Sequence, residues 1–243
     1  MIVLMTDFGE SEYVGAMKGV ILSIAPTARI VDLTHSISPQ SVREGAWVLL
    51  QNFHHFPFDT LFVCVVDPGV GTNRDAVYVH TSHYRFIGPD NGLLYPAVHK
   101  DGVKQIHSLS IDEKASSTFH GRDVFAVAAA HLETQTTESH LGPQKTSLDV
   151  ELKFHLKERE GEVVRVDRFG NIITNLPPVD FGAVTMKTNA GILHLSHCRT
   201  YHEGPHEGVF IITGSSNTLE ISAKNTRASG YLDLHTGDRL TIE

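Results

Sequence analysis

The chain of 243 residues has little cysteine, no excess of positive charge and no long hydrophobic run. Cys64 and Cys198 are far apart in the sequence, and Cys64 lies in the run LFVCVV, where cysteine usually acts as a small buried hydrophobic residue. Lys and Arg number 20 against 28 Asp and Glu, which gives a formal net charge of −8, and no basic cluster offers itself to a phosphate backbone. We therefore expect neither a disulfide nor a nucleic-acid partner.

The chain also lacks the features of membrane insertion. No stretch approaches the ~20 consecutive apolar residues of a membrane-spanning helix. The start, MIVLMTDFG, has no basic region before its short apolar run, unlike a secretory signal peptide. These absences predict no membrane partner and a cytoplasmic location.

Residues 1–150 alternate apolar, strand-like runs with amphipathic helical runs, which is typical of a layered α/β domain with a mostly parallel central sheet. The expected strands are 2–6, 28–33, 60–66, 76–81 and 84–88. Apolar residues at helical spacing predict helices over 12–25, 41–53 and 123–134.

Residues 151–160 are charged and have no sheet pattern, so they are interpreted as a connector. From 161 to 243 the sequence consists of short alternating segments separated by Gly, Pro or Asn turns. This pattern predicts a smaller, C-terminal all-β domain, either barrel-like or a sandwich.

The 16 histidines raise the question of a metal site, above all in the segment GILHLSHC. In a strand, successive side chains point to opposite faces, so His194 and His197 are expected to face apart rather than toward one ion. The sequence therefore predicts no metal site.

Asp7 and Asp67 each follow an apolar run that has the composition of a buried parallel strand. Ligands of open α/β sheets bind outside the carboxyl ends of such strands, so these two carboxylates are candidates for one site. The loop after Asp67, PGVGTN, contains glycines that allow close approach of the backbone, and Arg74 can fold back onto Asp67. An ion pair that only stabilises the loop is the equally good alternative.

His120 directly precedes Gly121 and the third expected helix. A histidine near a helix N-terminus has its pKa lowered, because the positive end of the helix dipole disfavours the charged imidazole. A neutral histidine can accept a proton. The structural alternative is a helix-capping or packing residue.

In the second domain, VDRFGNIITNL places Asp167 and Asn171 around a turn, and GSSNTLE places Ser215, Ser216 and Asn217 in a polar loop. Asn can both donate to and accept from a purine edge, and Asp can accept from an ammonium group or from ribose hydroxyls. Ordinary turn chemistry explains both segments equally well.

Five motifs in this order, TDFG, VVDPGVGT followed by Arg74, GPDNGLL, FHGRDVFA and VDRFGNIITN, resemble those of the S-adenosyl-L-methionine hydroxide adenosyltransferases, the relatives of fluorinase and chlorinase enzymes. The resemblance spans nearly the whole chain. It implies hydrolysis of S-adenosyl-L-methionine to adenosine and L-methionine, by attack of water or hydroxide on the 5′-carbon of the ribose. It implies no cofactor, and it implies a homotrimer with its sites between subunits.

By the same resemblance, the catalytic set of the family falls on Asp67, Arg74 and His120. Asp7 resembles the residue that binds the ribose hydroxyls, and Asn171 resembles the adenine contact. Asp167 and Ser216 resemble the residues that bind the methionine amine and its neighbouring groups. The loop departs from the Ser-Arg pattern of fluorinase, because Asn217 stands in place of the arginine, so the register of Ser216 is open by one residue.

Two other functions remain open from the sequence. One is a sensor that binds adenosine or S-adenosyl-L-methionine without useful turnover. The other is a halogenase, which the carboxylate of Asp67 disfavours because it would repel a halide.

Overall fold

The computed structural model describes residues 1–134, 140–189 and 191–243 of the chain. These residues form two compact units, Met1–Leu152 and Lys153–Glu243. The division falls inside the segment 151–160 that was interpreted as a connector, and the first strand of the second unit starts at Glu160.

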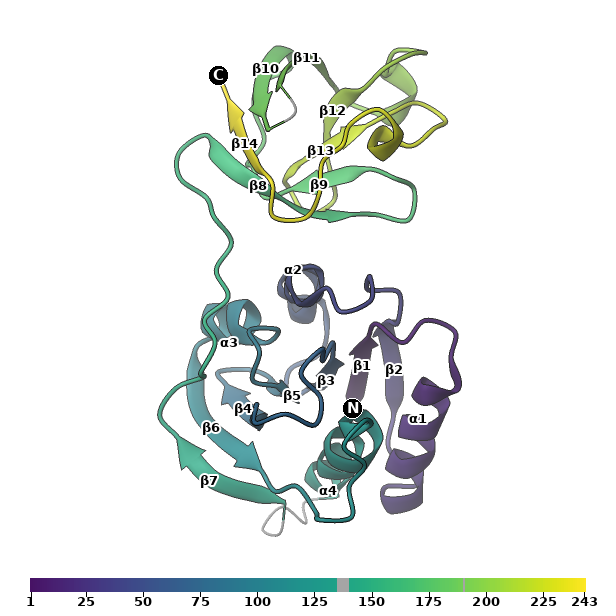
Figure 1. The fold of residues 1–243 in the computed structure, drawn as a ribbon, viewed down its shortest axis with the longest axis vertical. Coiled ribbons are helices and arrows are strands. Elements are labelled where there is room, and N and C mark those ends of the chain that lie inside the picture. The colour runs from purple at the N-terminus through teal and green to yellow at the C-terminus, as the bar shows by residue number, and fades with distance from the viewer. Residues whose placement is uncertain (135–139, 190) are drawn as a thin grey trace. The chain divides into compact units, whose positions relative to one another are not determined.

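The first unit is an α/β domain around one seven-stranded sheet (Figure 1). The sheet order is β2-β1-β3-β5-β4-β6-β7. Its strands are β1 (Ile2–Thr6), β2 (Ile30–Thr34), β3 (Leu61–Val65), β4 (Ala76–Thr81), β5 (Arg85–Pro89), β6 (Val103–Leu109) and β7 (Leu141–Lys145). Four neighbouring strands, β2, β1, β3 and β5, are parallel, whereas β4, β6 and β7 join by antiparallel pairing. The expected α/β fold is confirmed, with an antiparallel half added to the parallel one.

Helices cover both faces of this sheet (Figure 1). They are α1 (Glu12–Ile24), α2 (Val42–Asn52), α3 (Tyr95–Asp101) and α4 (Val127–Glu133), with a 3-10 turn at Phe53–His55 and a π-helical turn at Gly121–Ala126. The core on one face contains residues of α1 and α4, and the core on the other contains residues of α2 and α3.

Strand β1 explains why the parallel strands are continuous apolar runs. Ile2 and Leu4 pack with α1 and α4, whereas Val3 and Met5 pack on the opposite face of the sheet. Because both faces are covered, neither side of the strand tolerates polar residues, and the chain shows no polar alternation there. The carboxylates of Asp7 and Asp67 accordingly come after β1 and β3 and not within them.

The second unit is a closed barrel, which decides between the barrel and the sandwich expected from the sequence. Its strand order is β10-β11-β12-β13-β9-β8-β14. The strands are β8 (Glu160–Val166), β9 (Ile172–Thr174), β10 (Gly182–Thr188), β11 (Gly191–Cys198), β12 (Phe210–Thr213), β13 (Leu219–Ser222) and β14 (Arg239–Ile242). Two 3-10 turns, Tyr201–Glu203 and Ala228–Gly230, complete it.

Three elements of the first unit were not expected from the sequence: α3, β6 and β7. The third expected helix also begins earlier than predicted, since the π-helical turn starts at Gly121 and runs into α4. Among the described residues, no helix has the length and apolar character needed to span a membrane.

Replacement of Phe62 tests the packing of the first unit. This side chain is fully buried in β3 and stacks on Phe86 with 5.3 Å between ring centroids. We expect Phe62→Ala to lower the free energy of unfolding by about 3–5 kcal/mol, because it removes a large buried ring and leaves a cavity. The measurement is urea unfolding followed by circular dichroism.

Phe58→Ala is the matched control, since Phe58 is 72% exposed. Its free energy of unfolding should change by no more than about 0.5 kcal/mol. Equal losses in the two variants would contradict the described core.

Candidate active site

The loop from Asp67 to Arg74 connects the end of β3 to the start of β4 through two consecutive turns. The N–H of Val70 donates to the carbonyl of Asp67 at 3.2 Å, and the N–H of Thr72 donates to the carbonyl of Gly69 at 3.1 Å. Gly71 has φ +76°, and a Cβ at that position would overlap the carbonyl oxygen of Ser117. Only glycine fits there, and the tight bend brings residue 74 back beside residue 67.

Asp67, Arg74 and His120 contact one another. The Nε of Arg74 donates to Asp67 Oδ1 at 2.9 Å, and its Nη2 donates to Asp67 Oδ2, so the ion pair is bidentate. The same Nη2 lies 2.9 Å from His120 Nδ1. The side chains of Arg74 and Asp67 are only 9% and 5% exposed, and His120 is buried. The structure thus brings together the three residues that the sequence singled out from distant motifs.

One nitrogen of the Arg74 guanidinium, Nη1, is buried and makes no hydrogen bond to the described residues. Behind it, the guanidinium lies over the ring of Phe125, 5.4 Å from the ring centroid. Nη1 is almost inaccessible to solvent, and Arg74 is not among the residues that line the cleft described below. The guanidinium therefore acts on that cleft through its charge and through its contacts with Asp67 and His120.

His120 is held in its neutral form. Burial lowers its pKa below the ordinary value of 6.5, and the positive charge of Arg74 lowers it further, against the opposite influence of Asp67 and Asp123. The expected direction is confirmed, although burial and Arg74 cause it rather than a helix dipole. Because a guanidinium only donates, Nδ1 of His120 must be the acceptor, and the proton of the neutral ring is on Nε2.

The local backbone explains where His120 points. It directly precedes the π-helical turn Gly121–Ala126, in which a Cβ on Gly121 would approach the ring of Phe119 to 3.1 Å. π-helical turns inside α-helices occur often at functional sites, because the extra residue changes the direction of a side chain.

Asp67, His120 and Asp7 line one cleft of the first unit, with a volume of about 610 Å³. Asp7 Oδ2 accepts a hydrogen bond from the backbone N–H of Gln40 at 2.7 Å. The parallel strands β1 and β3 are neighbours, so the residues that follow them share this edge of the sheet, as expected.

Three aromatic side chains of the cleft wall were not expected from the sequence. Phe8, Tyr13 and Phe119 meet edge to face, with ring centroids 5.0 to 5.9 Å apart. Phe8 and Tyr13 are close in the sequence, but Phe119 comes from a distant segment, and the signal in the sequence is that Phe8 and Phe119 adjoin Asp7 and His120. Such a wall suits a flat, partly apolar ligand.

Asp167 and Asn171 line a cleft of the second unit, with a volume of about 1330 Å³. Asp167 Oδ1 accepts from the backbone N–H groups of Phe169 and Asn171, and Oδ2 accepts from Asn171 Nδ2, each at 2.9 Å. These bonds build the turn between β8 and β9. They also hold both side chains at the wall of the cleft, so the turn and the binding interpretations are compatible.

Ser216 differs from the other proposed binding residues. It lies in the turn between β12 and β13, where the N–H of Asn217 donates to the carbonyl of Gly214 at 3.0 Å. Among the described residues that line the second cleft, Ser215 is present and Ser216 is not. The alignment of this loop with the family motif is open by one residue, so either Ser215 or Ser216 corresponds to the binding serine of the family.

The second cleft also contains a buried carboxyl group that the sequence analysis missed. Glu220 in β13 accepts a hydrogen bond from the hydroxyl of Tyr201 at 3.0 Å. Burial raises the pKa of Glu220, and the nearby charge of Asp167 contributes in the same direction. Burial and Glu220 together raise the pKa of Tyr201 to about 12. The signal in the sequence was a charged residue inside the apolar run LEIS.

The histidines of β11 face apart, as expected. His194 is exposed, whereas His197 is buried and its ring nitrogens lie near Asp180 O and Thr213 Oγ1, at 3.2 and 3.1 Å. In the described residues, no group of three or more His, Cys, Asp or Glu side chains is arranged to hold a metal ion.

Comparisons with known proteins agree with the motif resemblance. A protein from Methanocaldococcus jannaschii named (R)-S-adenosyl-L-methionine hydrolase is 38% identical over 261 residues, covering 100% of this chain and 95% of that protein. A fluorinase from Nocardia brasiliensis is 28% identical, covering 95% of this chain and 92% of that protein. The crystal structure of an uncharacterized conserved protein from Thermotoga maritima matches with a TM-score of 0.90 and 34% identity over 100% of both chains.

Two family models cover most of the chain. The model of the SAM hydroxide adenosyltransferase N-terminal domain matches residues 2–142, and that of the C-terminal domain matches residues 161–241, where SAM is S-adenosyl-L-methionine. The chain therefore belongs to the S-adenosyl-L-methionine hydroxide adenosyltransferase family.

Proposed function

We propose that this protein hydrolyses S-adenosyl-L-methionine to adenosine and L-methionine. The observation that carries the proposal is the contact between Asp67, Arg74 and His120, of which Asp67 and His120 line a cleft. Membership of the family and the similarity to proteins named (R)-S-adenosyl-L-methionine hydrolase support it.

The reaction places its main demand on the nucleophile. The oxygen of water forms a bond to the 5′-carbon, the bond from that carbon to the sulfonium sulfur breaks, and its electron pair leaves with a neutral thioether. One proton of the water is released. Because the sulfonium leaves without protonation, the protein needs no general acid. It must position one water molecule and take its proton, and positioning alone supplies up to about 7–11 kcal/mol in favourable cases.

The three side chains divide these tasks. Arg74 stays protonated, so it stabilises the developing hydroxide by its charge and holds Asp67 and His120 in place. His120 is neutral with its proton on Nε2, so it serves as a donor that orients the water. Asp67 is then the group of the three that accepts the proton.

The remaining contacts are proposed for the substrate itself. Asp7 accepts from the ribose hydroxyls, Asn171 pairs with the adenine edge, and Asp167 accepts from the amino group of the methionine part. Ser216, or its neighbour Ser215, contacts the same end of the substrate. No metal or other cofactor takes part in this scheme, since the substrate carries its own leaving group.

The assembly and the location of the protein complete the proposal. We infer a homotrimer from the family resemblance, and we keep the cytoplasmic location expected from the sequence as a proposal. Light scattering coupled to gel filtration measures the molar mass, which should be three times the 26.8 kDa of one chain.

The substitution Asp67→Asn tests the catalytic assignment. It keeps the shape of the side chain but removes the proton acceptor, so kcat should fall by about 10²–10⁴-fold. Mass spectrometry of adenosine formed from the (R) and (S) sulfonium epimers, assayed separately, gives the rate. Asp233→Asn is the control, because the side chain of Asp233 is 93% exposed and outside both clefts, and its rate should match the wild type.

Three outcomes contradict the assignment. An unchanged rate in Asp67→Asn removes Asp67 from the chemistry. Tight adenosine binding by the wild type without turnover identifies a sensor. Formation of 5′-chloro-5′-deoxyadenosine in high chloride identifies a halogenase.

The protonation state of His120 is a separate prediction. Since burial and Arg74 lower its pKa, the imidazole should titrate below 6.5 in an NMR pH series. Below pH 6.5 the unfolded chain binds a proton at this ring before the folded protein does. The contribution of His120 to the free energy of unfolding therefore falls as the pH drops from 6.5 to the folded pKa, and is constant below it.

Urea unfolding of the wild type and of His120→Gln between pH 7 and pH 4, in steps of about half a pH unit, measures this contribution to stability. The wild type should lose more stability on acidification than the variant. A titration of His120 at or above 6.5, or equal pH slopes in the two proteins, would show that the ring is not held neutral.

A further inference from the structure

The motif GPDNGLL contributes no side chain to the proposed chemistry, yet its centre is buried beside the catalytic loop. Asp90 and Asn91 directly follow Pro89, the last residue of β5, which is the parallel neighbour of β3. The side chain of Asp90 is 1% exposed. A carboxylate is this deeply buried only where other groups hold it, so its partners are informative.

Asn91 fixes the backbone on the Asp67 side of the loop. Its Nδ2 donates to the carbonyl oxygen of Val66 at 2.9 Å, and its Oδ1 accepts from the N–H of Leu93 at 3.1 Å. The carbonyl of Val66 belongs to the same planar peptide group as the N–H of Asp67. Asn91 therefore sets the orientation of the peptide from which Asp67 projects.

Asp90 fixes the backbone on the Arg74 side. Its N–H donates to the carbonyl oxygen of Asp75 at 2.8 Å, and Asp75 directly follows Arg74. The carboxylate of Asp90 accepts from Lys145 Nζ at 2.9 Å and from the N–H of Asp149 at 3.0 and 3.1 Å. The adjacent residues Asn91 and Asp90 thus bond the backbone at the two ends of the loop from Asp67 to Arg74.

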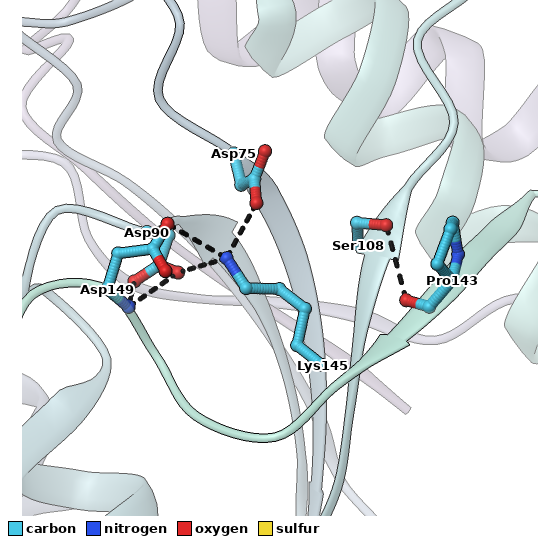
Figure 2. Close-up of polar contacts among 6 residues, drawn as sticks. All are labelled: Asp75, Asp90, Ser108, Pro143, Lys145 and Asp149. Carbon is cyan, nitrogen blue, oxygen red and sulfur yellow. Dashed lines mark hydrogen bonds and ion pairs between the residues drawn. The ribbon is translucent and has the colours of Figure 1, made fainter.

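Lys145, at the end of β7, completes the arrangement (Figure 2). Its ammonium group lies among three carboxylates, 2.6 Å from Asp75, 2.9 Å from Asp90 and 2.9 Å from Asp149. Burial opposes the charge of Lys145, but hydrogen bonds to these aspartates outweigh it and raise the pKa of Lys145. The ammonium therefore stays charged and holds the side chain of Asp75 against that of Asp90.

We propose that Asn91 and Asp90, together with Lys145, are positioning residues that set the geometry of the Asp67–Arg74 pair. Neither end of the loop can shift without breaking a bond to this segment. The catalytic consequence rests on the proposed function, whereas the geometric consequence does not.

The first test is kinetic and uses Asn91→Ala. Loss of the bond to Val66 frees the peptide that carries Asp67, and misplacement of a catalytic group by about 1 Å can cost 10²-fold in rate. We expect kcat to fall by about 10- to 100-fold. KM should stay close to that of the wild type, because Asn91 lies outside the residues that line the cleft.

The matched control is Asn52→Ala. Asn52 Nδ2 also donates to a valine carbonyl, that of Val48, at 2.7 Å, but at the end of α2. Asn91→Ala loses two neutral hydrogen bonds and Asn52→Ala loses one, so each variant should lose only a few kcal/mol of stability at most. Asn52→Ala should keep the wild-type kcat, and equal values of kcat in the two variants would overturn the proposal.

The second test needs no substrate. Lys145→Met releases Asp75, so Arg74 should move away from His120 and the pKa of His120 should rise toward 6.5. Lys18→Met is the control, because Lys18 also bonds a carboxylate, Asp32 at 2.6 Å, outside the loop. If Lys145→Met does not fold, Asp75→Ala replaces it, since that variant leaves Lys145 with two carboxylates. An equal pKa of His120 in the wild type and the Lys145 or Asp75 variant would overturn the proposal.

The two tests separate the positioning role from the proposed function. A wild type that forms no adenosine, with the pKa of His120 raised only in the Lys145 or Asp75 variant, rejects the reaction and keeps the positioning role. A wild type that forms adenosine, with full kcat in Asn91→Ala, keeps the reaction and rejects the positioning role.

Discussion

The bidentate ion pair between Asp67 and Arg74 is the interaction around which the first unit is organised. A buried carboxylate is tolerated only with a well-placed partner, and the guanidinium supplies two parallel bonds to it. The partner must come from the other end of a tight loop, so the loop needs a glycine at position 71 and fixed backbone at both ends. Burial lowers the pKa of His120, and Arg74 contributes in the same direction by its positive charge while it also donates to Nδ1.

The sheet explains why these groups can meet at all. Strands β1 and β3 are buried on both faces, so their polar residues are displaced to the positions just beyond the strand ends, Asp7 and Asp67. The two parallel strands end at the same edge, and the π-helical turn brings His120 to that edge from the far part of the unit. The helices on both faces bury the strands of the sheet, and the polar side chains Asp7, Asp67 and His120 therefore gather at its edge.

Much of this arrangement could be predicted from local signals. The apolar strands, the first two helices and the barrel strands have clear periodicity, and the residues of the proposed catalytic set stand in short motifs. Helix α3 was missed because it is short, Tyr95–Asp101, and has a proline in its first turn. Strand β6 was missed because its first three residues are exposed and two of them, Lys104 and Gln105, are polar. The aromatic wall and the pairing of Glu220 with Tyr201 depend on contacts between distant segments, which no local pattern encodes.

The close approach of Gly71 to Ser117 has a mechanical consequence. Ser117 belongs to the segment that leads into His120, and no space for even a methyl group separates it from the loop that ends at Arg74. Backbone contact therefore blocks any further approach of the loop to the histidine segment. For the proposed reaction, the separation of Arg74 and His120 then has a steric lower limit that does not depend on their hydrogen bond.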